Sequence, residues 1–433
     1  ILAGRPDLVP TEYVKEFSKL QAHVAPVSFD EIKPIVEEDL GMSVSDAFLS
    51  FDPIALASAS IAQVHVARTH EGDDVVVKIL KPNVEDQLNK DLEILEIMSE
   101  LAESYVDELR PFRPSMIVRE IKRNLLKELR FDDELSNMEK FSQNFRAHPF
   151  LVVPRPFKAL SSRKVLTMQH LHGRKIQEVI DHPQDESNVD GKNIIKEGID
   201  CFLESILVHG FFHADPHGGN ILILEDQRLG LLDFGSVAWL SPRSKEAVVN
   251  MFLALVTQDF ESLILEYLYL SPPSPGSRSS TRIDELQKEV SQVFSPYYGR
   301  ELKDIPAGEL LLEATSIAFK HRIVLPQDLV MVFKSIMTME GIGRALDPEF
   351  DLLSSGNRFA KLVIRNQYQP ARLAKEAFLI LRDVKRFLRN SPRLVGESLR
   401  QFESGEATIN LIHKENHLPM RQQADSANRI AIA

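Results

Sequence analysis

The spacing of apolar residues changes from a helical to a strand-like pattern early in the chain. Residues 1–48 predict two helices. The second of them has Ser28 and Glu31 as a capping box at its start and Gly41 as its stop. Residues 54–80 are rich in β-branched side chains on both sides of a glycine-containing turn, so they predict strands joined as a hairpin.

Helices dominate from residue 82 onward, with short strands between them. Helical periodicity begins at Pro82-Asn83 and again at Pro114-Ser115, where proline suits the first turn of a helix. The later elements are an extended stretch over 151–172, an apolar helix over Gly191–Gly210, strands at Ile221–Leu224 and Leu229–Leu232, and helices from 243 onward. The proline-rich loop 271–276 is the best linker candidate. The pattern therefore predicts a small β-containing region followed by a mostly helical one.

Composition narrows the class of protein. The 433 residues are 43% apolar and 26% charged, which is typical of a folded chain and excludes extensive disorder. The single cysteine, Cys201, excludes a disulfide framework, and its apolar helix predicts a buried thiol. Trp239 is also expected in the core. The net charge of −12 argues against nucleic acid as a partner, and no apolar run reaches about 18 residues, as a membrane-spanning helix would need.

Three short motifs in a fixed order carry the candidate chemistry. They are Val75-Val76-Val77-Lys78, His213-Ala214-Asp215-Pro216-His217-Gly218-Gly219-Asn220 and Asp233-Phe234-Gly235. Phosphoryl transfer needs a cation on the phosphates, a carboxylate near the nucleophile and oxygen ligands for Mg²⁺. Lys78 fits the first role and Asp215 the second. Asn220 and Asp233 fit the third, and Asn220 follows Asp215 by five residues, as in the kinase catalytic loop.

Each motif on its own has a simpler interpretation. A lysine in a strand is usually a solvated edge residue, and Asp-Phe-Gly after a strand is often only a turn. His213, Asp215 and His217 also form a candidate metal-binding loop. That alternative is the weaker one, because it leaves Lys78 and Asp233 unexplained. The ordered set with its flanking strands favours a phosphoryl-transfer site.

The loop before Lys78 departs from the protein-kinase pattern. Protein kinases place Gly-x-Gly-x-x-Gly-x-Val over the phosphates. In the same frame this chain has Ala57, Ser58, Ala59, Ser60, Ile61, Ala62, Gln63 and Val64. Alanine stands at all three glycine positions, and its Cβ keeps the backbone further from a phosphate. We expect the loop to hold a nucleotide differently from a protein kinase. A small-residue turn packed under a helix is the alternative, and it does not explain the match in frame.

These segments resemble the UbiB/AarF family of atypical, kinase-like proteins. The segments that are similar to the family's motifs are Ala57–His65, Val77-Lys78 through Pro82, His213–Leu222, Leu232–Gly235 and Leu346-Asp347-Pro348. The likeness runs over nearly the whole chain, and the His-Ala-Asp-Pro-His sequence is its most specific part.

The resemblance implies an α+β, protein-kinase-like bilobal fold with a small β-containing N-lobe, a helical C-lobe and extra family-specific helices. We expect a helical extension over 1–50, an N-lobe with inserted helices over 51–172, a catalytic C-lobe over 173–265 and a helical region over 266–433. Known members support ubiquinone or related prenyl-lipid metabolism at membranes, and they are regarded as ATP binders and ATPases. ATP and Mg²⁺ are therefore the expected cofactors, and a prenyl-quinone or other lipid intermediate is an expected partner.

The resemblance also assigns the partner of Lys78. Glu134 is the candidate for the helix glutamate that pairs with this lysine, and Glu128 is the alternative. Arg130 stands where the family has aspartate, and acids follow where the family has bases. We expect Arg130 to pair with Asp133 or Glu134 one helical turn on.

Other positions are similar to the hinge and to the ends of the family's chains. Met168, Gln169 and His170 correspond to the hinge, whose backbone is expected to hydrogen-bond adenine. Ala62 replaces the glycine that the family usually has at the third loop position. The family's Lys-x-Gly-Gln motif would precede the first residue, and membrane-spanning helices would follow the last. We interpret the chain as shortened at both ends around an intact catalytic core.

Three functions remain open on this basis. The first is an Mg·ATP-dependent enzyme in which Asp215 orients or deprotonates the attacking group, such as water. The second is a nucleotide-sensing scaffold without useful turnover, which the alanine loop and the altered segment around Arg130 favour. The third is a protein kinase acting in trans, which ranks lowest because the glycine loop is absent.

A basic segment gives an independent indication of a membrane surface. Residues 371–400 carry eight basic and three acidic side chains, a local charge of +5, interleaved with large apolar residues. A basic amphipathic helix suits an anionic bilayer, and a docked helix with a solvated basic face is an equal alternative. We expect membrane association at the cytoplasmic face of a bacterial inner membrane, with a mitochondrion or a plastid as alternatives.

Overall fold

The computed structural model describes residues 25–106, 114–182, 189–270, 280–321 and 325–357, together with residues 359 and 382. The chain divides into two compact units, residues 1–364 and 365–433, and all the elements described below belong to the first. The helix predicted before residue 25, the linker loop 271–276 and the basic segment 371–400 fall outside the described residues, apart from residue 382.

One antiparallel sheet forms the N-lobe, with the strand order β1-β2-β3-β5. Its strands are β1 (Ser50–Ser58), β2 (Ala62–Arg68), β3 (Asp74–Leu80) and β5 (Val165–Gln169). The turn between β2 and β3 contains Gly72, whose positive φ of 92° suits glycine. The predicted hairpin is confirmed. β1 begins four residues earlier than predicted, because Ser50 pairs with Arg68 at the far end of β2.

Side chains of β3 alternate between two cores. One face of the strand carries Val75, Val77 and Ile79. These three side chains pack against α2 (Phe29–Leu40) and α3 (Val44–Ala47). Val76 and Leu80 instead join the main core. Because side chains along a strand alternate with a period of two, Lys78 lies on the same face as Val76 and Leu80. The apolar pattern of β3 therefore turns this lysine away from α2 and towards the rest of the molecule.

The start and the end of α2 follow the prediction. The Ser28 backbone N–H donates to the Glu31 carboxylate at 3.2 Å, as the predicted capping box requires. Gly41 ends the helix in the left-handed region, with φ of 68°. Both predictions are confirmed, because each depends only on residues next to one another in the chain.

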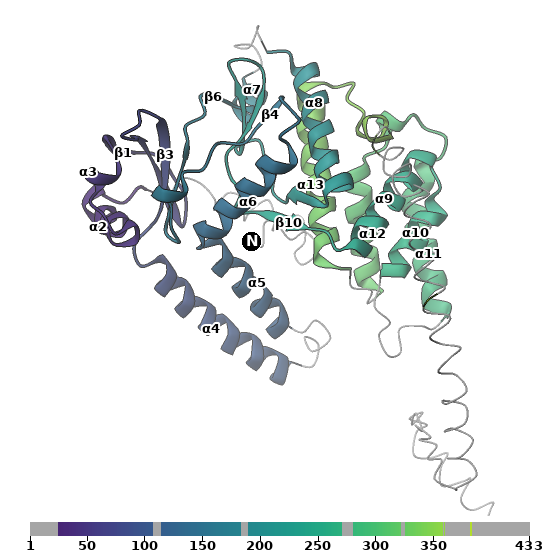
Figure 1. Ribbon diagram of the computed structural model, residues 1–433. Coiled ribbons are helices and arrows are strands. Elements are labelled where there is room, and N and C mark those ends of the chain that lie inside the picture. Colours follow the sequence, from purple (N-terminus) through teal and green to yellow (C-terminus); the bar gives the residue numbers. More distant parts are fainter. Residues whose placement is uncertain are drawn as a thin grey trace, which may run out of the picture. The chain divides into compact units, whose positions relative to one another are not determined.

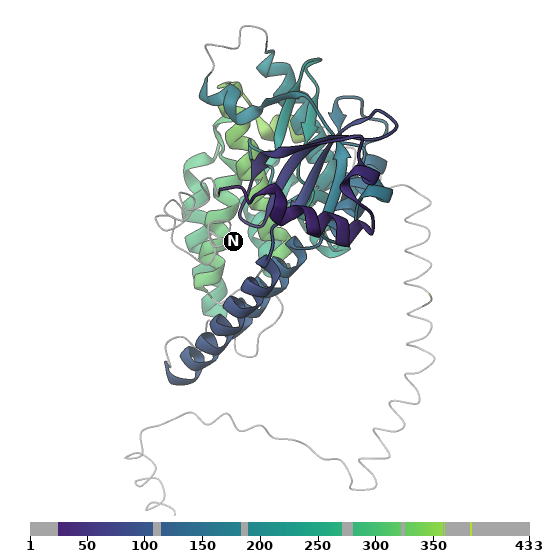
Figure 2. The same cartoon turned by 90° about the vertical axis from the view of Figure 1, so that its left-hand side faces the viewer.

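Three helices are inserted between β3 and β5. They are α4 (Val84–Tyr105), α5 (Pro114–Glu128) and α6 (Phe131–Asn144). α4 and α5 run side by side as an antiparallel pair (Figures 1 and 2), and Lys122 bridges to Glu96 at 2.7 Å. α6 takes a different direction and buries Phe131 and Phe141 in the main core. It therefore connects the sheet of the N-lobe to the elements that follow.

Two small sheets come next. Their strands are β4 (Leu151–Val152), β6 (Gly173–Lys175), β7 (Phe211–His213), β8 (Ile221–Leu224), β9 (Leu229–Leu231) and β10 (Val237–Trp239). The first sheet has the order β4-β9-β8-β6, and β7 pairs with β10 in the second. The predicted strands β8 and β9 are confirmed. β7 and β10 were not predicted, because a run of three residues has no readable period.

Helices make up the rest of the described chain. They are α7 (Ile176–Asp181), α8 (Gly191–Glu204), α9 (Pro242–Thr257), α10 (Phe260–Leu270), α11 (Ser280–Phe294), α12 (Ala307–Lys320) and α13 (Gln327–Leu346), with single turns at Lys158–Leu160, Ser295–Tyr297 and Leu302–Asp304. A π-helical turn, Ser205–His209, ends α8 before Gly210. A small sheet lobe followed by a helical part matches the predicted kinase-like fold class (Figure 1).

Two single residues test the predicted core. Cys201 is 4% exposed, and burial raises the pKa of its thiol to about 12, so the predicted buried thiol is confirmed. Trp239 is 57% exposed, so its predicted place in the core is wrong. It lies at the end of β10 and packs one face of its ring on Phe211, with 4.3 Å between the ring centroids.

The helical region depends on a close approach between α12 and α13. Gly308 is buried near the start of α12, and a Cβ at this position would collide with the backbone of Met337 on α13. Its N–H donates to the buried Glu340 carboxylate at 3.0 Å. Because glycine has no side chain, the two helices pack backbone against backbone at Gly308.

We predict that Gly308→Ala destabilises the protein by about 1–3 kcal/mol, because the added methyl group overpacks the helix contact. Gly341→Ala is the matched control: Gly341 is on α13 and has open space around its Cβ position. It should be neutral or stabilise by up to about 1 kcal/mol through helix propensity. Urea unfolding of both variants measures the difference, and equal midpoints would contradict this packing.

Candidate functional site

Lys78 is held between two carboxylates from different elements. Its Nζ donates to both carboxylate oxygens of Glu134 on α6, at 3.0 and 2.8 Å. Asp233, two residues after the end of β9, lies 3.5 Å from the same Nζ. The Lys78 side chain is 17% exposed and that of Glu134 only 3%. This ion pair therefore joins β3, α6 and the Asp233-Phe234-Gly235 segment.

The pKa values of Lys78 and of the two carboxylates beside it are shifted in different directions. Burial alone would lower the pKa of Lys78, but Asp233 and Glu134 outweigh it, so that pKa lies above its ordinary value. Burial raises the pKa of Glu134 to about 7, against the opposing effect of Lys78. Burial would also raise the pKa of Asp233, but Lys78 and the Gly235 N–H outweigh it and hold that pKa below its usual range. Asp233, whose side chain is 37% exposed, is therefore the more acidic of the two carboxylates.

α6 also fixes the segment that carries Asp233. The Glu134 carboxylate accepts the backbone N–H of Phe234 at 3.2 Å, and Asn137 donates to the Phe234 carbonyl at 2.9 Å. The Phe234 ring is fully buried and meets Phe141 edge-on, with 5.3 Å between the ring centroids. With this ring in the core, the preceding Asp233 side chain faces Lys78.

The loop from His213 to Asn220 is braced by its own hydrogen bonds. The Asp215 N–H donates to Nδ1 of His213 at 3.1 Å, and the Asn220 N–H donates to the His217 carbonyl at 2.9 Å. His213 is buried, and burial lowers the pKa of its imidazole, which favours the neutral ring. Among the described residues no group of three or more His, Cys, Asp and Glu side chains is arranged to hold a metal ion. The alternative of a metal site at His213, Asp215 and His217 therefore has no geometric support here.

The β8–β9 hairpin brings the two predicted metal ligands together. Asn220 precedes β8, and its carbonyl accepts the N–H of Leu232 at 3.0 Å. Asp233 is the next residue, so Asn220 and Asp233 stand at the same end of this hairpin. An amide oxygen and an ionised carboxylate are ligands that Mg²⁺ prefers. The donor set therefore fits the predicted ion.

The alanine-rich loop forms a tight turn between β1 and β2. The Ala59 N–H donates to the Ala62 carbonyl at 2.8 Å. Lys81, which follows β3, donates from Nζ to the Ala59 carbonyl at 2.8 Å and from its backbone to the Ile61 carbonyl at 2.9 Å. The Ser58 hydroxyl is buried and has no hydrogen-bond partner within the described part of the chain. An unpaired buried donor in this loop suits a ligand with acceptor oxygens.

Gln63 and His65, in the same motif, have structural contacts. The Gln63 amide donates to His65 Nε2 at 2.9 Å and to the Val27 carbonyl at 3.1 Å, and it accepts the Val27 N–H at 2.8 Å. Nδ1 of His65 lies 2.8 Å from the Asp52 carbonyl. Both side chains are fully buried. This chain of hydrogen bonds ties the segment before α2 to β2 and β1, and it explains two motif residues that face no ligand.

The predicted hinge residues follow one another at the end of β5. The backbone N–H of Gln169 donates to the Arg155 carbonyl at 2.9 Å, and that of His170 donates to the Asp74 carbonyl at 3.0 Å. Both N–H groups are therefore already engaged. The next N–H, that of Leu171, has no partner among the described residues. No sequence pattern distinguished Leu171 from its neighbours.

Arg130 forms one of the two expected ion pairs, that with Asp133, and an additional pair with Asp132. Arg130 pairs with Asp132 at 2.7 Å and more loosely with Asp133 at 3.5 Å. Of the two expected partners, Asp133 therefore pairs with Arg130, and Glu134 pairs with Lys78 instead. Glu128, the alternative partner for Lys78, lies at the exposed C-terminal end of α5.

Lys334 is a site residue that the sequence did not reveal. It lies on α13, and its Nζ is 2.9 Å from Oδ1 of Asp215. The two residues are 119 positions apart, and Lys334 stands between Phe333 and Ser335 with no motif around it. Only the folded chain brings this cation to the predicted catalytic aspartate.

Two models of known protein families match this chain. Residues 19–267 match the ABC1 atypical kinase-like domain, and residues 290–351 match the UbiB helical domain. The chain belongs to the UbiB/ABC1 family of atypical kinase-like proteins. The resemblance drawn from the motifs is therefore confirmed, and Lys334 lies within the helical domain.

Relatives in this family cover nearly all of the chain. A "Probable protein kinase UbiB" from Xylella fastidiosa (strain 9a5c) is 32% identical over 414 residues, which is 93% of this chain and 73% of the relative. A protein of the same name from Xanthomonas oryzae pv. oryzae is 30% identical over 95% of this chain and 75% of its own. A Mycobacterium tuberculosis structure, the complex of Rv3197 with erythromycin, has a TM-score of 0.56 at 20% identity, over 82% of this chain and 89% of that one. At this sequence identity, the similarity to the Rv3197 structure shows only a shared fold.

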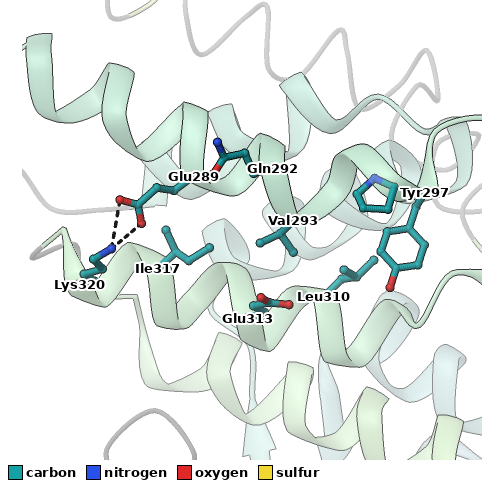
Figure 3. Close-up of a pocket in the computed structure, with 9 residues that line it drawn as sticks. Glu289, Gln292, Val293, Tyr297, Leu310, Glu313, Ile317 and Lys320 are labelled. Carbon is teal, nitrogen blue, oxygen red and sulfur yellow. Dashed lines mark hydrogen bonds and ion pairs between the residues drawn. The ribbon is translucent and has the colours of Figure 1, made fainter.

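Two surface hollows lie outside the cluster around Lys78. One lies between α11 and α12, where Val293 and Ile317 line it and Glu289 pairs with Lys320 at 2.9 Å at one end (Figure 3). It contains no predicted site residue of this UbiB-family protein. The other lies beside the hinge and is lined by Asp73, Asp74, Arg155, Gln169, His170 and His172.

We predict that Lys78→Met destabilises the protein by about 3 kcal/mol, because it leaves Glu134 buried without its counter-ion. Replacing both residues, as Lys78→Met with Glu134→Leu, should recover most of that loss, since an apolar pair removes the unpaired carboxylate. Arg130→Ala, which removes an exposed pair, should leave stability unchanged. Urea unfolding compares the variants. A wild-type midpoint in Lys78→Met would show that the ion pair does not hold the elements together.

Proposed function

We propose that this UbiB-family protein is an Mg·ATP-dependent phosphoryl-transfer enzyme, with water as an acceptor, that is, an ATPase. The observation that supports it is the position of Lys78, which is paired with Glu134 on α6 and 3.5 Å from Asp233. Asp215 and Asn220 lie on the neighbouring loop between β7 and β8. These residues supply a cation, a carboxylate base and two oxygen ligands, which is the set that phosphoryl transfer needs.

Each residue then has one role in the proposed reaction. Lys78, oriented by Glu134, contacts the α- and β-phosphates. Asn220 and Asp233 would hold Mg²⁺, which neutralises charge on the phosphates when bound. Asp215 accepts a hydrogen bond from the attacking water and orients it. At the hinge we assign the adenine contact to the Leu171 N–H, because the N–H groups of the preceding two residues are engaged.

The alanine-rich loop is proposed to hold the phosphates less closely than a glycine loop. Lys81 restrains the turn from one side through the Ala59 and Ile61 carbonyls. The Ser58 hydroxyl offers one donor to a phosphate oxygen. The loop therefore lacks the glycines with which a protein kinase brings its backbone close to the phosphates. This is why we rank an ATPase above a protein kinase, although the relatives are named as probable protein kinases.

A nucleotide-sensing scaffold is the second candidate function. The observation that favours it is the ion pair between Asp215 and Lys334, which occupies one oxygen of the proposed base. In this alternative, nucleotide binding orders the two lobes and no phosphate is released.

We predict that Asp215→Asn lowers phosphate release by about 100-fold or more, while nucleotide affinity stays within about threefold, because a lost base affects the chemical step. Asp233→Asn should weaken Mg²⁺-dependent binding of ADP, since it removes an ionised ligand. Calorimetric titration with Mg·ADP and a phosphate-release assay measure the two effects. Arg130→Ala, at an exposed pair outside the cluster, is the control.

The outcomes separate the candidate functions. Nucleotide binding without phosphate release, unchanged by Asp215→Asn, would select the scaffold. Transfer of labelled phosphate to a protein, lost in Lys78→Ala, would select a protein kinase. No binding of Mg·ATP or Mg·ADP by the intact protein would overturn the proposal as a whole.

We also propose that the protein acts at a membrane surface on a prenyl-quinone or related lipid pathway. The support is the family membership and the local charge of +5 over residues 371–400. None of the helices in the described part of the chain has the length and apolar character needed to cross a bilayer. For the basic segment we propose attraction to an anionic membrane surface.

We predict flotation with vesicles that contain phosphatidylglycerol at low salt and release at about 0.5 M salt, because screening weakens attraction between exposed charges. Neutral phosphatidylcholine vesicles are the control. A variant with Lys385, Arg386 and Arg389 changed to Gln should float less than the wild type. Equal flotation with both vesicle types, or none at low salt, would contradict the electrostatic part of the proposal.

A further inference from the structure

The helical domain supplies a charged partner to the proposed catalytic loop. Nζ of Lys334, on α13, lies 2.9 Å from Oδ1 of Asp215. The Lys334 side chain is 24% exposed and that of Asp215 38%, so the pair sits at the edge of the protein interior. Its contact with Oδ1 alone leaves Oδ2 of Asp215 outside this ion pair.

The catalytic loop has no cation of its own near Asp215. The residues between Asp215 and Asn220 are Pro216, His217, Gly218 and Gly219. The other lysine of the site, Lys78, is committed to Glu134 and Asp233. A carboxylate that must orient an attacking group needs a fixed hydrogen-bond partner. In the described part of the chain, α13 provides it.

α13 is held firmly where it carries this lysine. The hydroxyl of the next residue, Ser335, lies 3.3 Å from the carbonyl of His213, two residues before Asp215, and 2.8 Å from the carbonyl of Met331 on its own helix. Val332, Phe333 and Ile336 on the same helix are buried in the main core. Further along, Gly308 allows α12 to pack against the helix backbone at Met337. The helix therefore presents Nζ of Lys334 from a fixed position.

We propose that Lys334 is a positioning residue, which holds Oδ1 of Asp215 so that Oδ2 faces the attacking group. This inference rests on the proposed function, because it assigns Lys334 a part in the same phosphoryl transfer. It makes the helical domain a component of the site. The opposite role, in which the lysine blocks Asp215, predicts faster turnover when Lys334 is removed.

The test compares Lys334→Met, Lys334→Gln and Lys334→Arg in the full chain, by steady-state release of phosphate from Mg·ATP. We expect kcat to fall by about 10- to 100-fold in the Met and Gln variants, with KM within about threefold, since a positioning residue affects the chemical step. Lys334→Arg keeps the charge and should restore at least part of kcat. Lys320→Met is the matched control, because it removes a lysine that pairs on the surface with Glu289.

A double-mutant cycle with Asp215→Asn separates positioning from a merely structural role. If Lys334 acts through Asp215, then Lys334→Met should change kcat by less than about twofold in the Asp215→Asn background. An equal loss of kcat in both backgrounds would overturn the inference. An unchanged or raised kcat in Lys334→Met would also overturn it. So would a variant in which only KM changes. A wild-type protein that releases no phosphate would overturn the proposed function itself, and this inference with it.

Discussion

The ion pairs around Lys78 are the constraint on which the rest of the site depends. They join residues 78, 134 and 233, which come from a strand, an inserted helix and the segment after a second hairpin. Glu134 serves two partners at once, because it also accepts the Phe234 N–H. A shift of α6 would therefore separate the lysine from its counter-ion and release the buried Phe234 ring. One carboxylate thus couples the orientation of the lysine to the direction of Asp233.

A second coupling runs through the helical domain. In a protein of this family the kinase-like part, residues 19–267, and the helical part, residues 290–351, could be regarded as separate modules. Here the helical part reaches the catalytic loop through Lys334 and Ser335 of α13. The backbone-to-backbone packing at Gly308 keeps that helix in place. The position of the proposed base is consequently set by residues more than 100 positions away along the chain.

Local patterns predicted the features that depend on neighbouring residues. The capping box at Ser28, the stop at Gly41 and the hairpin around Gly72 all rest on short-range geometry, and all three form as predicted. Features that depend on distant partners were predicted less well. Trp239 is predicted in the core, but it lies at the end of β10, where its side chain is 57% exposed.

The sequence alone determined the family, the class of fold and the order of the motifs, because those are carried by residue types at short, regular spacings. The tertiary structure decided which groups meet. Lys78 pairs with Glu134 and not with Glu128, because α6, which carries Glu134, packs against β5, the neighbour of β3 in the sheet. In the folded chain the hinge N–H groups of Gln169 and His170 already donate to other backbone carbonyls. Lys334 is brought to Asp215 in the same way, by tertiary packing. Such contacts are set by the packing of whole elements, and no local run of residues encodes them.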